Sequence, residues 1–344
     1  MKIYIPEDYR PALPPEATEQ SIQKLKWSFQ NELADSLNLR RVTAPLFVLS
    51  GTGINDDLNG TERAVSFPVR DMDGCRAEVV HSLAKWKRLK LGQYRVPPGH
   101  GIYTDMNAIR ADEELDNIHS LYVDQWDWER SIRAEDRHLG FLRDIVTKIY
   151  DVVRTIEKQT CAYIPQIEPV LPEKITFVHS EDLQATWPHL SPRDREREAA
   201  RIHGAVFIIG IGMPLADGQK HDGRAPDYDD WSTPTDDRHH GLNGDIIFWN
   251  PVLDNSFEIS SMGIRVDRAA LLHQLELEHC PERLALTFHK ALLNDEIPLS
   301  IGGGIGQSRL CMFFLRCAHI GEVQASLWPE EMTATCKRHN IILK

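Results

Sequence analysis

The stretch GIYTDMNAIRADEELDNIHSLYVDQWDWER, residues 101–130, predicts a long antiparallel hairpin. A strand-like run at 102–110 precedes an acidic, turn-prone tip at 111–117 and a second run at 120–128. Side chains alternate between the faces of a strand, so the second run has two unlike faces. One carries Tyr122, Asp124, Trp126 and Trp128, and the other carries Val123, Gln125, Asp127 and Glu129. The second face is either a polar site on a sheet or an ordinary solvated side.

Length and composition indicate a folded globular chain. It has 344 residues, of which 42% are hydrophobic and 26% charged, enough for a full core in one large domain or two. The formal net charge of −12 repels phosphate, so we expect no nucleic-acid partner. No apolar run approaches the roughly 18 residues of a membrane span. The six cysteines form no CxxC pair. We expect a cytoplasmic protein without a membrane partner or a zinc site.

The pattern along the chain predicts a single catalytic domain over residues 1–344, with a loosely ordered arm at 1–16. Apolar residues at helical spacing predict a helix that ends near Asn38. Pro45 interrupts the strand expected at 41–50 and places it at an edge or interface. Further strands are expected at 64–70, 77–83, 175–179, 205–211, 245–249 and 257–266, and further helices at 83–94, 142–156, 269–278 and 282–294. We therefore predict an α+β fold with a central, mostly antiparallel sheet flanked by helices.

Near the C-terminus, the segment IGGGIGQSRLCMFFL, residues 301–315, passes from glycines into an apolar helix. Glycine lets a backbone approach a ligand closely, and a helix N-terminus favours anions. Arg309 lies one turn into this helix, where it suits a nucleotide. The signal is weak alone, since glycines also allow tight packing.

Two acids on consecutive predicted strands, Asp245 and Glu258, suggest a magnesium site that bridges phosphates. The alternative, two solvated strand ends, is the better interpretation of an isolated pair. The candidate anion ligands are Arg110, Arg224, Arg265 and Arg309, because a guanidinium matches carboxylate or phosphate.

Two polar loops complete the candidates. The loop at 214–241 is long enough to be a functional lid, although a solvated acidic loop is equally simple. The loop at 51–60 carries Asp56 and Asp57 after a Gly-Thr-Gly turn, so either carboxylate suits a pocket.

The order of these parts resembles the three motifs of the class II aminoacyl-tRNA synthetase catalytic core, especially the aspartyl and asparaginyl branch. The chain is more similar still to ammonia-dependent asparagine synthetases, the aspartate–ammonia ligases. The resemblance covers about 22–329 and rests on HSLAKWKR at 81–88, YVDQWDWER at 122–130, RAPDYDDWS at 224–232, GLNGDI at 241–246, SSMGIRVD at 260–267 and IGGGIGQSR at 301–309.

This resemblance implies that ATP activates L-aspartate as β-aspartyl-AMP and that ammonia then displaces AMP. It implies three catalytic residues, Asp56, Arg110 and Gln125. The implied aspartate ligands are Ser82, Lys85, Asp127, Arg224, Asp229, Ser261 and Arg265. The implied ATP ligands are Arg110, Asp245, Glu258, Gly304 and Arg309, with Asp245 and Glu258 holding Mg²⁺. Residues 51–56 read GTGIND where bacterial members have GDGTQD, and Asp56 aligns with the family's catalytic aspartate.

One expectation conflicts with simple strand alternation. In an unbroken strand, Glu258 would face away from Ser261 and Arg265, yet all three are expected at one pocket. We therefore predict a bulge or twist near 260–263, permitted by Gly263.

Two rival functions stay open. A tRNA-charging enzyme needs an anticodon-binding module, for which we expect no room before residue 22 or after 329. A non-catalytic paralogue would be expected to lack Arg110, Arg309 or the acidic pair, and all are present. Because the segment around Pro45 forms the two-fold interface in the class II fold, the resemblance also implies a homodimer.

Overall fold

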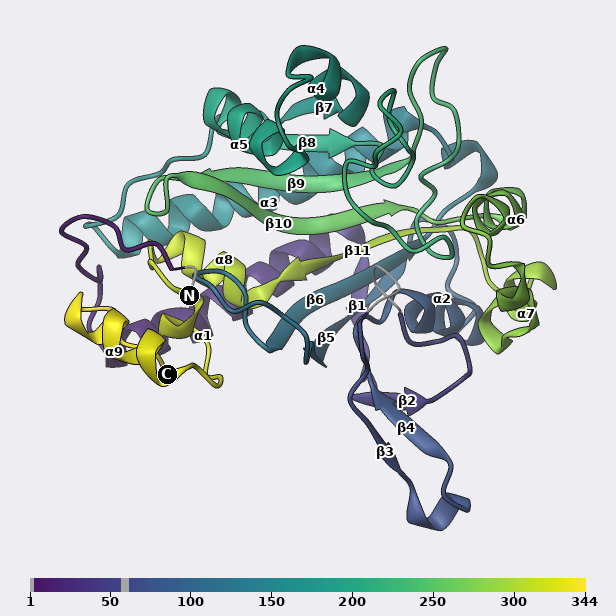
Figure 1. Ribbon diagram of the computed structural model, residues 1–344, viewed down its shortest axis with the longest axis horizontal. Helices are drawn as coiled ribbons and strands as arrows, with labels where there is room; N and C mark the ends of the chain where they lie inside the picture. The colour runs from purple at the N-terminus through teal and green to yellow at the C-terminus, as the bar shows by residue number, and fades with distance from the viewer. Residues whose placement is uncertain (1–2, 57–61) are drawn as a thin grey trace.

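The hairpin predicted at 101–130 forms two adjacent strands of an eight-stranded sheet in a computed structural model, which describes residues 3–56 and 62–344 (Figure 1). In spatial order the strands are β1 (Leu39–Arg41), β5 (Gly101–Ile109), β6 (Tyr122–Ser131), β11 (Ser300–Gly306), β10 (Asn255–Ile264), β9 (Asn243–Asn250), β8 (Ala205–Ile209) and β7 (Thr176–His179). Neighbours from β5 to β8 are antiparallel, whereas β1 and β7 join the edges in parallel. The sheet is therefore mixed, and the mostly antiparallel expectation is confirmed in part.

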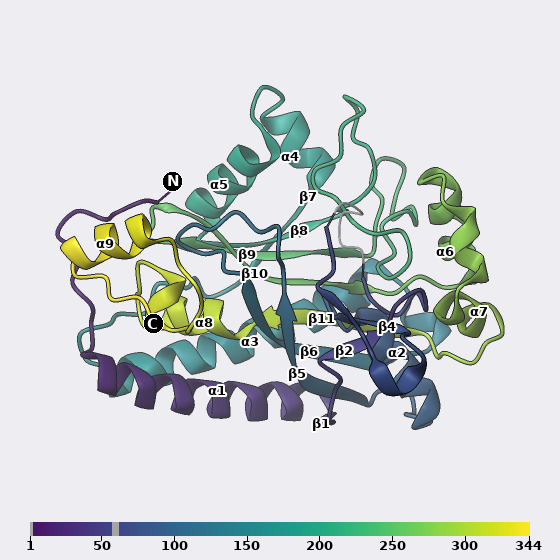
Figure 2. The same ribbon diagram turned by 60° about the horizontal axis from the view of Figure 1, so that its bottom comes forward.

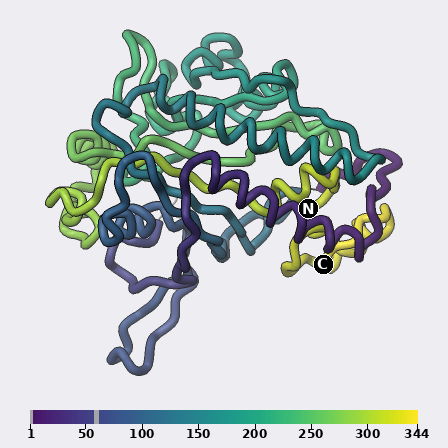
Figure 3. Tube along the Cα trace, turned by 180° about the vertical axis from the view of Figure 1, so that it is seen from behind, coloured from purple at the N-terminus to yellow at the C-terminus, as the bar shows by residue number. Residues whose placement is uncertain are grey.

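The aromatic face of β6 packs into the main core. Trp126 and Trp128 are buried there, and the Trp126 ring lies 4.6 Å from that of Phe29. Phe29 belongs to α1 (Pro15–Leu37), which lies beside α3 (Leu139–Tyr163) across this face of the sheet (Figure 2, Figure 3). Both helices present apolar residues at helical spacing, so one side of each is buried against the sheet.

The other face of the sheet carries the polar side chains of β6. Lys87 from α2 (Ala84–Gln93) reaches this face and donates to the carbonyls of Trp128 and Gly303. Figure 2 shows α4 (Ser180–Thr186) and α5 (Pro192–His203) on the side of the sheet opposite α1. The remaining helices are α6 (Arg268–Leu277), α7 (Thr287–Leu293), α8 (Gln307–Phe314) and α9 (Glu330–Arg338), with 3₁₀ turns at Arg70–Met72, Ala134–Asp136, Pro281–Ala285 and Ile320–Glu322.

Pro45 separates two strands that belong to different sheets, so the single strand expected at 41–50 is wrong. β1 ends at Arg41, and β2 (Phe47–Leu49) pairs instead with β4 (Arg76–Val79). β4 also pairs with β3 (Ser66–Pro68), which makes a small sheet that projects from the body (Figure 1). A proline cannot donate to a ladder, and this break lets the chain leave the main sheet.

The glycines at 302–304 lie in a central strand, and the helix expected after them begins at Gln307. β11 pairs with both β6 and β10, and α8 begins only after Gly306. Gly302 lies opposite Glu129, Gly304 opposite Asp127, and Gly306 opposite Gln125. The glycine strand thus leaves room for the polar face of β6.

The predicted bulge is confirmed, one residue earlier than expected. Glu258 pairs with Ile247 and Ser260 with Ile246, so Ile259 is the extra residue of β10. Residues after the bulge change face, and Glu258 therefore shares its face with Ser261.

In the described part of the arm expected at 1–16, residues 3–14 contact the rest of the chain. The Tyr4 amide donates to the Asn117 side chain at 2.7 Å, and the Tyr9 hydroxyl donates to Glu322 at 2.9 Å. α1 begins at Pro15, whose missing N–H costs nothing at a helix start.

The single helix expected at 282–294 is divided into the 3₁₀ turn at Pro281–Ala285 and α7. Within the described ranges, none of the helices has the length and apolar character needed to cross a membrane.

We predict that Trp126→Ala lowers the free energy of unfolding by about 3–5 kcal/mol, since it leaves a cavity between the sheet and α1. Urea unfolding measures the loss. Trp27→Ala is the matched control. The Trp27 ring lies on α1 and is 66% exposed, so its removal is expected to change stability by less than about 0.5 kcal/mol. Equal losses in the two variants would contradict the packing described here.

Candidate active site

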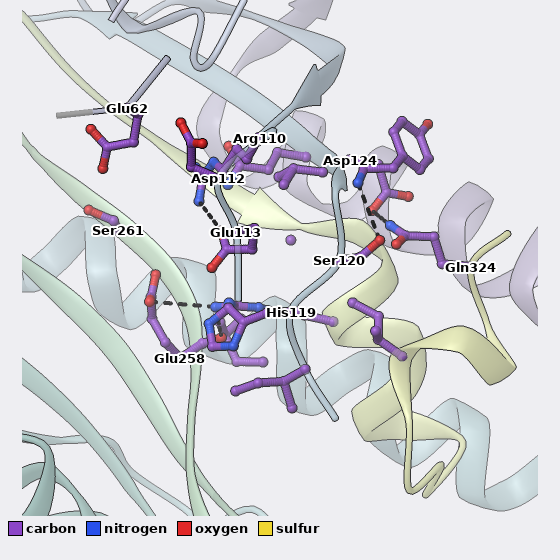
Figure 4. A pocket seen from close by; sticks show the side chains of 18 of the residues that line it. Glu62, Arg110, Asp112, Glu113, His119, Ser120, Asp124, Glu258, Ser261 and Gln324 are labelled. Atoms are coloured by element: carbon purple, nitrogen blue, oxygen red, sulfur yellow. Dashed lines mark hydrogen bonds and ion pairs between the residues drawn. The ribbon is translucent and has the colours of Figure 1, made fainter. Parts of the chain in front are cut away.

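A cavity of about 380 Å³ lies over the polar face of the sheet, beside the tip of the β5–β6 hairpin. Figure 4 shows Arg110, Glu258 and Ser261 around it, with Asp124 and Gln324 at another side. Six of the predicted site residues line this cavity: Arg110, Gln125, Arg224, Glu258, Ser261 and Arg309. Segments far apart in the sequence therefore meet at one place.

Strand register explains how the cavity floor is built. Asp127 on β6 lies opposite Gly304, Gly304 lies opposite Ser261, and Ser261 lies opposite Asp245. These residues form one row across four strands and share a face. A Cβ atom on Gly304 would collide with the side-chain oxygens of Gln125 and Asp127, so a larger residue would force these two site residues to move. Gly304 thus contributes space to the site.

The two arginines that flank the cavity differ in their partners. The Arg110 guanidinium, just after β5, lies 3.9 Å from Glu113, and its buried Nε has no hydrogen-bond partner among the described residues. Arg309, on α8, donates to the Glu258 carbonyl at 3.1 Å and lies 3.5 Å from the Glu258 carboxylate. Both guanidinium groups are suited to bind an anion in the cavity.

A buried charge cluster lies next to this floor. Arg265 donates to Glu129 at 2.9 Å and also to Asp229, and all three side chains are almost fully buried. Burial raises the pKa of Asp229, and the Arg265 guanidinium opposes that shift. Asp229 Oδ2 is buried without a hydrogen-bond partner among the described residues. Arg265, which the resemblance implies as an aspartate ligand, does not line the cavity. Its guanidinium instead pairs with Glu129 and Asp229 of the protein.

Arg224 and Asp245 form an ion pair that the sequence did not predict. Arg224 NH2 donates to both Asp245 oxygens, and the side chains are 9% and 5% exposed. Burial raises the pKa of Asp245 to about 7; Arg224 lowers it, and Glu258 adds to the rise. The structure thus pairs an expected substrate ligand with an expected metal ligand.

Three more predicted residues, Lys85, Ser82 and Asp56, are not among those that line the cavity. The Lys85 ammonium is 2.9 Å from Asp227, and both side chains are buried. The Ser82 hydroxyl donates to Asp56 Oδ2 at 3.1 Å, and Asp56 is 2% exposed. Asp57 lies outside the described residues.

Sequence reasoning missed several residues around the site. Asp227 and Glu129 hold the buried cations Lys85 and Arg265. Asp227 stands in the RAPDYDDWS string, but no pattern distinguished it from a solvated loop acid. Asp124, which lines the cavity, accepts from Lys26 at 2.9 Å and from Ser308. Asp124 shares a face of β6 with two tryptophans, so the sequence pattern did not indicate that it lines the cavity.

Solved structures share this fold. The asparaginyl-tRNA synthetase of Entamoeba histolytica in complex with asparaginyl-adenylate aligns over 90% of this chain and 66% of its own, with a TM-score of 0.64 and 14% identity. The Pyrococcus horikoshii asparaginyl-tRNA synthetase with asparaginyl-adenylate aligns over 91% and 70%, with a TM-score of 0.62 and 16% identity. These likenesses show the class II synthetase fold alone.

Sequence comparisons identify the family. The family profile described as aspartate-ammonia ligase matches residues 16–340. A relative from Bacteroides fragilis named aspartate--ammonia ligase is 60% identical over 338 residues, 98% of each chain. A relative of the same name from Clostridium perfringens is 54% identical over 342 residues, 99% of each. The chain belongs to the aspartate–ammonia ligase family.

Proposed function

We propose that this carbon–nitrogen ligase makes L-asparagine from L-aspartate and ammonia with ATP, through β-aspartyl-AMP, and releases AMP and pyrophosphate. The observation that carries the proposal is the convergence of Arg110, Gln125 and Arg309 on one cavity, with the buried Asp229 next in sequence to Tyr228, which lines that cavity. This arrangement offers cationic groups for phosphate and an anionic group for the amino group of an amino acid.

In the first step, the aspartate β-carboxylate attacks the α-phosphorus of ATP. An O–P bond forms, the bond from the α-phosphorus to the bridging oxygen breaks, and pyrophosphate leaves with the electron pair. Arg110 neutralises the α-phosphate and the attacking carboxylate, which otherwise repel one another. Its buried Nε, which has no partner among the described residues, supports this role. Arg309 binds the nucleotide at its adenine or γ-phosphate side.

The buried carboxylates orient the amino acid. Asp229 Oδ2 and Asp127 accept hydrogen bonds from its α-ammonium group, and Ser261 and Gln125 donate to its oxygens. Lys85 and Arg265, which do not line the cavity, supply positive charge toward its carboxylates. Their ion pairs with Asp227 and Asp229 support a preorganised site rather than one that assembles on binding. Arg224, held by Asp245, also lines the cavity.

In the second step, ammonia attacks the acyl carbon. Asp56 accepts a proton from ammonium, because only neutral ammonia carries the attacking lone pair. A C–N bond forms, the attacking nitrogen loses a proton to solvent, the bond from the acyl carbon to the phosphate oxygen breaks, and AMP leaves with the electron pair. Gln125 donates to the oxyanion that develops on the acyl oxygen.

Asp245 and Glu258 would hold magnesium after the ion displaces Arg224 from Asp245, because both Asp245 oxygens accept from Arg224 in this structure. The bulge at Ile259 puts both acids on one face, with Glu258 opposite Ile247 and Asp245 opposite Ser261. Their mutual repulsion contributes to the raised pKa of Asp245, and Mg²⁺ in nucleotide enzymes is commonly held by one or two carboxylates with phosphates and water. The described residues contain no cluster of three or more His, Cys, Asp or Glu side chains suited to a metal. When bound, the ion would neutralise phosphate charge.

We predict that Arg309→Ala lowers turnover by about 100-fold or more, because it removes a charged group from the nucleotide cavity. The assay supplies ATP, magnesium, aspartate and ammonium and measures AMP, pyrophosphate and asparagine, which wild-type protein should form in equal amounts. Arg338→Ala on the exposed side of α9 is the control and should keep full activity. Formation of ADP, or of AMP only when tRNA is added, would overturn the function.

We predict that the stability of the folded protein depends on pH through the titration of Asp245. The pKa of Asp245 is raised to about 7 in the folded protein, whereas its ordinary value in the unfolded chain is 3.8. The folded state therefore binds more protons between these values, and its stability falls as pH rises through the window. Urea unfolding at pH 5 and pH 8 should show a wild-type loss larger than that of Asp245→Asn by at least about 1 kcal/mol. Equal losses would mean that Asp245 titrates as an exposed acid.

We also propose that the protein is a homodimer, as the class II fold implies for the segment around Pro45. Sedimentation at micromolar concentration should give twice the chain mass. A single species of the chain mass would refute the dimer.

A further inference from the structure

We propose that His289, on α7, is a positioning residue that acts through Asp227 to fix Lys85 and the segment at 51–56. This inference rests on the function proposed above. It concerns how Lys85 and Asp56 are held, and His289 itself has no part in the reaction steps.

Asp227 is the centre of the device. Its side chain is 0% exposed, and three cationic or donor groups converge on it. Lys85 Nζ lies at 2.9 Å, Arg283 NH1 at 3.2 Å and His289 Nε2 at 3.0 Å. Burial raises the pKa of Asp227, but Lys85 and His289 outweigh it and hold the pKa well below its usual range. Asp227 is therefore a permanent buried anion, and its position depends on all three neighbours.

His289 fixes the orientation of the Asp227 carboxylate. Its Nε2 faces the Asp227 carboxylate, so Nε2 carries the hydrogen of that bond. An imidazole donor occupies one lone pair of the anion from a fixed angle, because the ring is fully buried and has few rotamers. A long lysine or arginine would hold the carboxylate less rigidly.

The other ring nitrogen faces the loop that leads to Asp56. A Cβ atom on Gly53 would lie 3.4 Å from His289 Nδ1, and Gly53 has a left-handed φ of 72°. The neighbouring Phe288 amide donates to the Thr52 carbonyl at 3.5 Å. α7 thus packs on the 51–53 turn as well as on Asp227.

A second path runs from Asp227 to the same loop. Lys85 Nζ also donates to the Asn55 carbonyl at 3.5 Å. The Asn55 side-chain oxygen accepts from the Asp56 amide at 3.0 Å and from the His81 amide at 2.9 Å. His289 therefore supports Asp56 from two sides, through the turn and through Lys85.

This network is separate from the groups assigned to ATP. Of the implied ATP ligands, Arg110 pairs with Glu113, Arg309 with Glu258, and Asp245 with Arg224. Loss of His289 should therefore weaken the use of aspartate and ammonium and spare the binding of ATP.

The test compares His289→Gln, His289→Asn and His289→Leu in the full-length protein. Glutamine can place its amide nitrogen near the position of Nε2, whereas asparagine is one methylene too short to do so. We expect His289→Gln to stay within about threefold of wild type, and the other two to lose about tenfold or more in kcat/KM for aspartate and ammonium, since a displacement of about 1 Å costs that much. KM for ATP should change by less than about twofold in all three.

The controls separate this effect from general damage. His179→Leu removes another buried histidine, from the edge strand β7, and should alter thermal stability without the KM split. Asp227→Asn, which keeps the shape of the side chain, should reproduce the split. If His289→Leu fails to fold, the comparison of the Gln and Asn variants decides the result.

Normal kinetics in His289→Asn, or equal losses for all three substrates, would overturn the positioning role. Equal defects in the Gln and Asn variants would do the same, because the donor position would then be irrelevant. If wild-type protein forms no asparagine, the proposed function fails first. An active wild type with unaffected variants refutes only the role of His289.

Discussion

The arrangement of this molecule depends on one constraint: several charged side chains are buried on one face of a sheet, and each needs a partner. Arg265 lies between Glu129 and Asp229, Lys85 meets Asp227, and Arg224 meets Asp245. A buried charge without a partner destabilises the fold by several kcal/mol, so removing one member of a pair makes the remaining charge destabilising. The pairs join β6, α2, β9, the end of β10 and the loop at 214–241, and they hold the site in one geometry.

Two backbone features make room for these charges. The glycines of β11 lie opposite the polar residues of β6, where a Cβ would collide with Glu129, Gln125 or Asp127. The bulge at Ile259 then returns Glu258 to the face of Ser261 and Asp245. Space on one strand and a changed register on another therefore bring the carboxylates and the cavity together. The opposite face, which carries Trp126, needs neither the glycines nor the bulge. Its apolar side chains pack against α1 with the regular alternation of a strand.

Much of the fold could be predicted from local pattern. The hairpin, its two unlike faces, α1 and α3 follow from periodicity and turn residues. The need for a bulge follows from strand alternation together with the site residues that the family resemblance implies. The predictions were weaker where tertiary contacts decide. Pro45 separates strands of two sheets, and the glycine segment is a central strand. Gln125, Ser261 and Arg309 do line the cavity, but Lys85 and Arg265 are ion-paired within the protein, and Asp227 and His289 were not selected.

By itself, the sequence determined which residues are polar inside apolar strands, where the strands turn and to which family the motifs belong. Those properties depend on the order of neighbouring residues. Only the tertiary structure decided which charge meets which. Arg224 and Asp245 are 21 residues apart, and His289 and Asp227 are 62 apart, so their pairing requires strands and helices to pack first. Electrostatic pairing in a buried site acts over a few ångströms, and sequence distance carries no information about it.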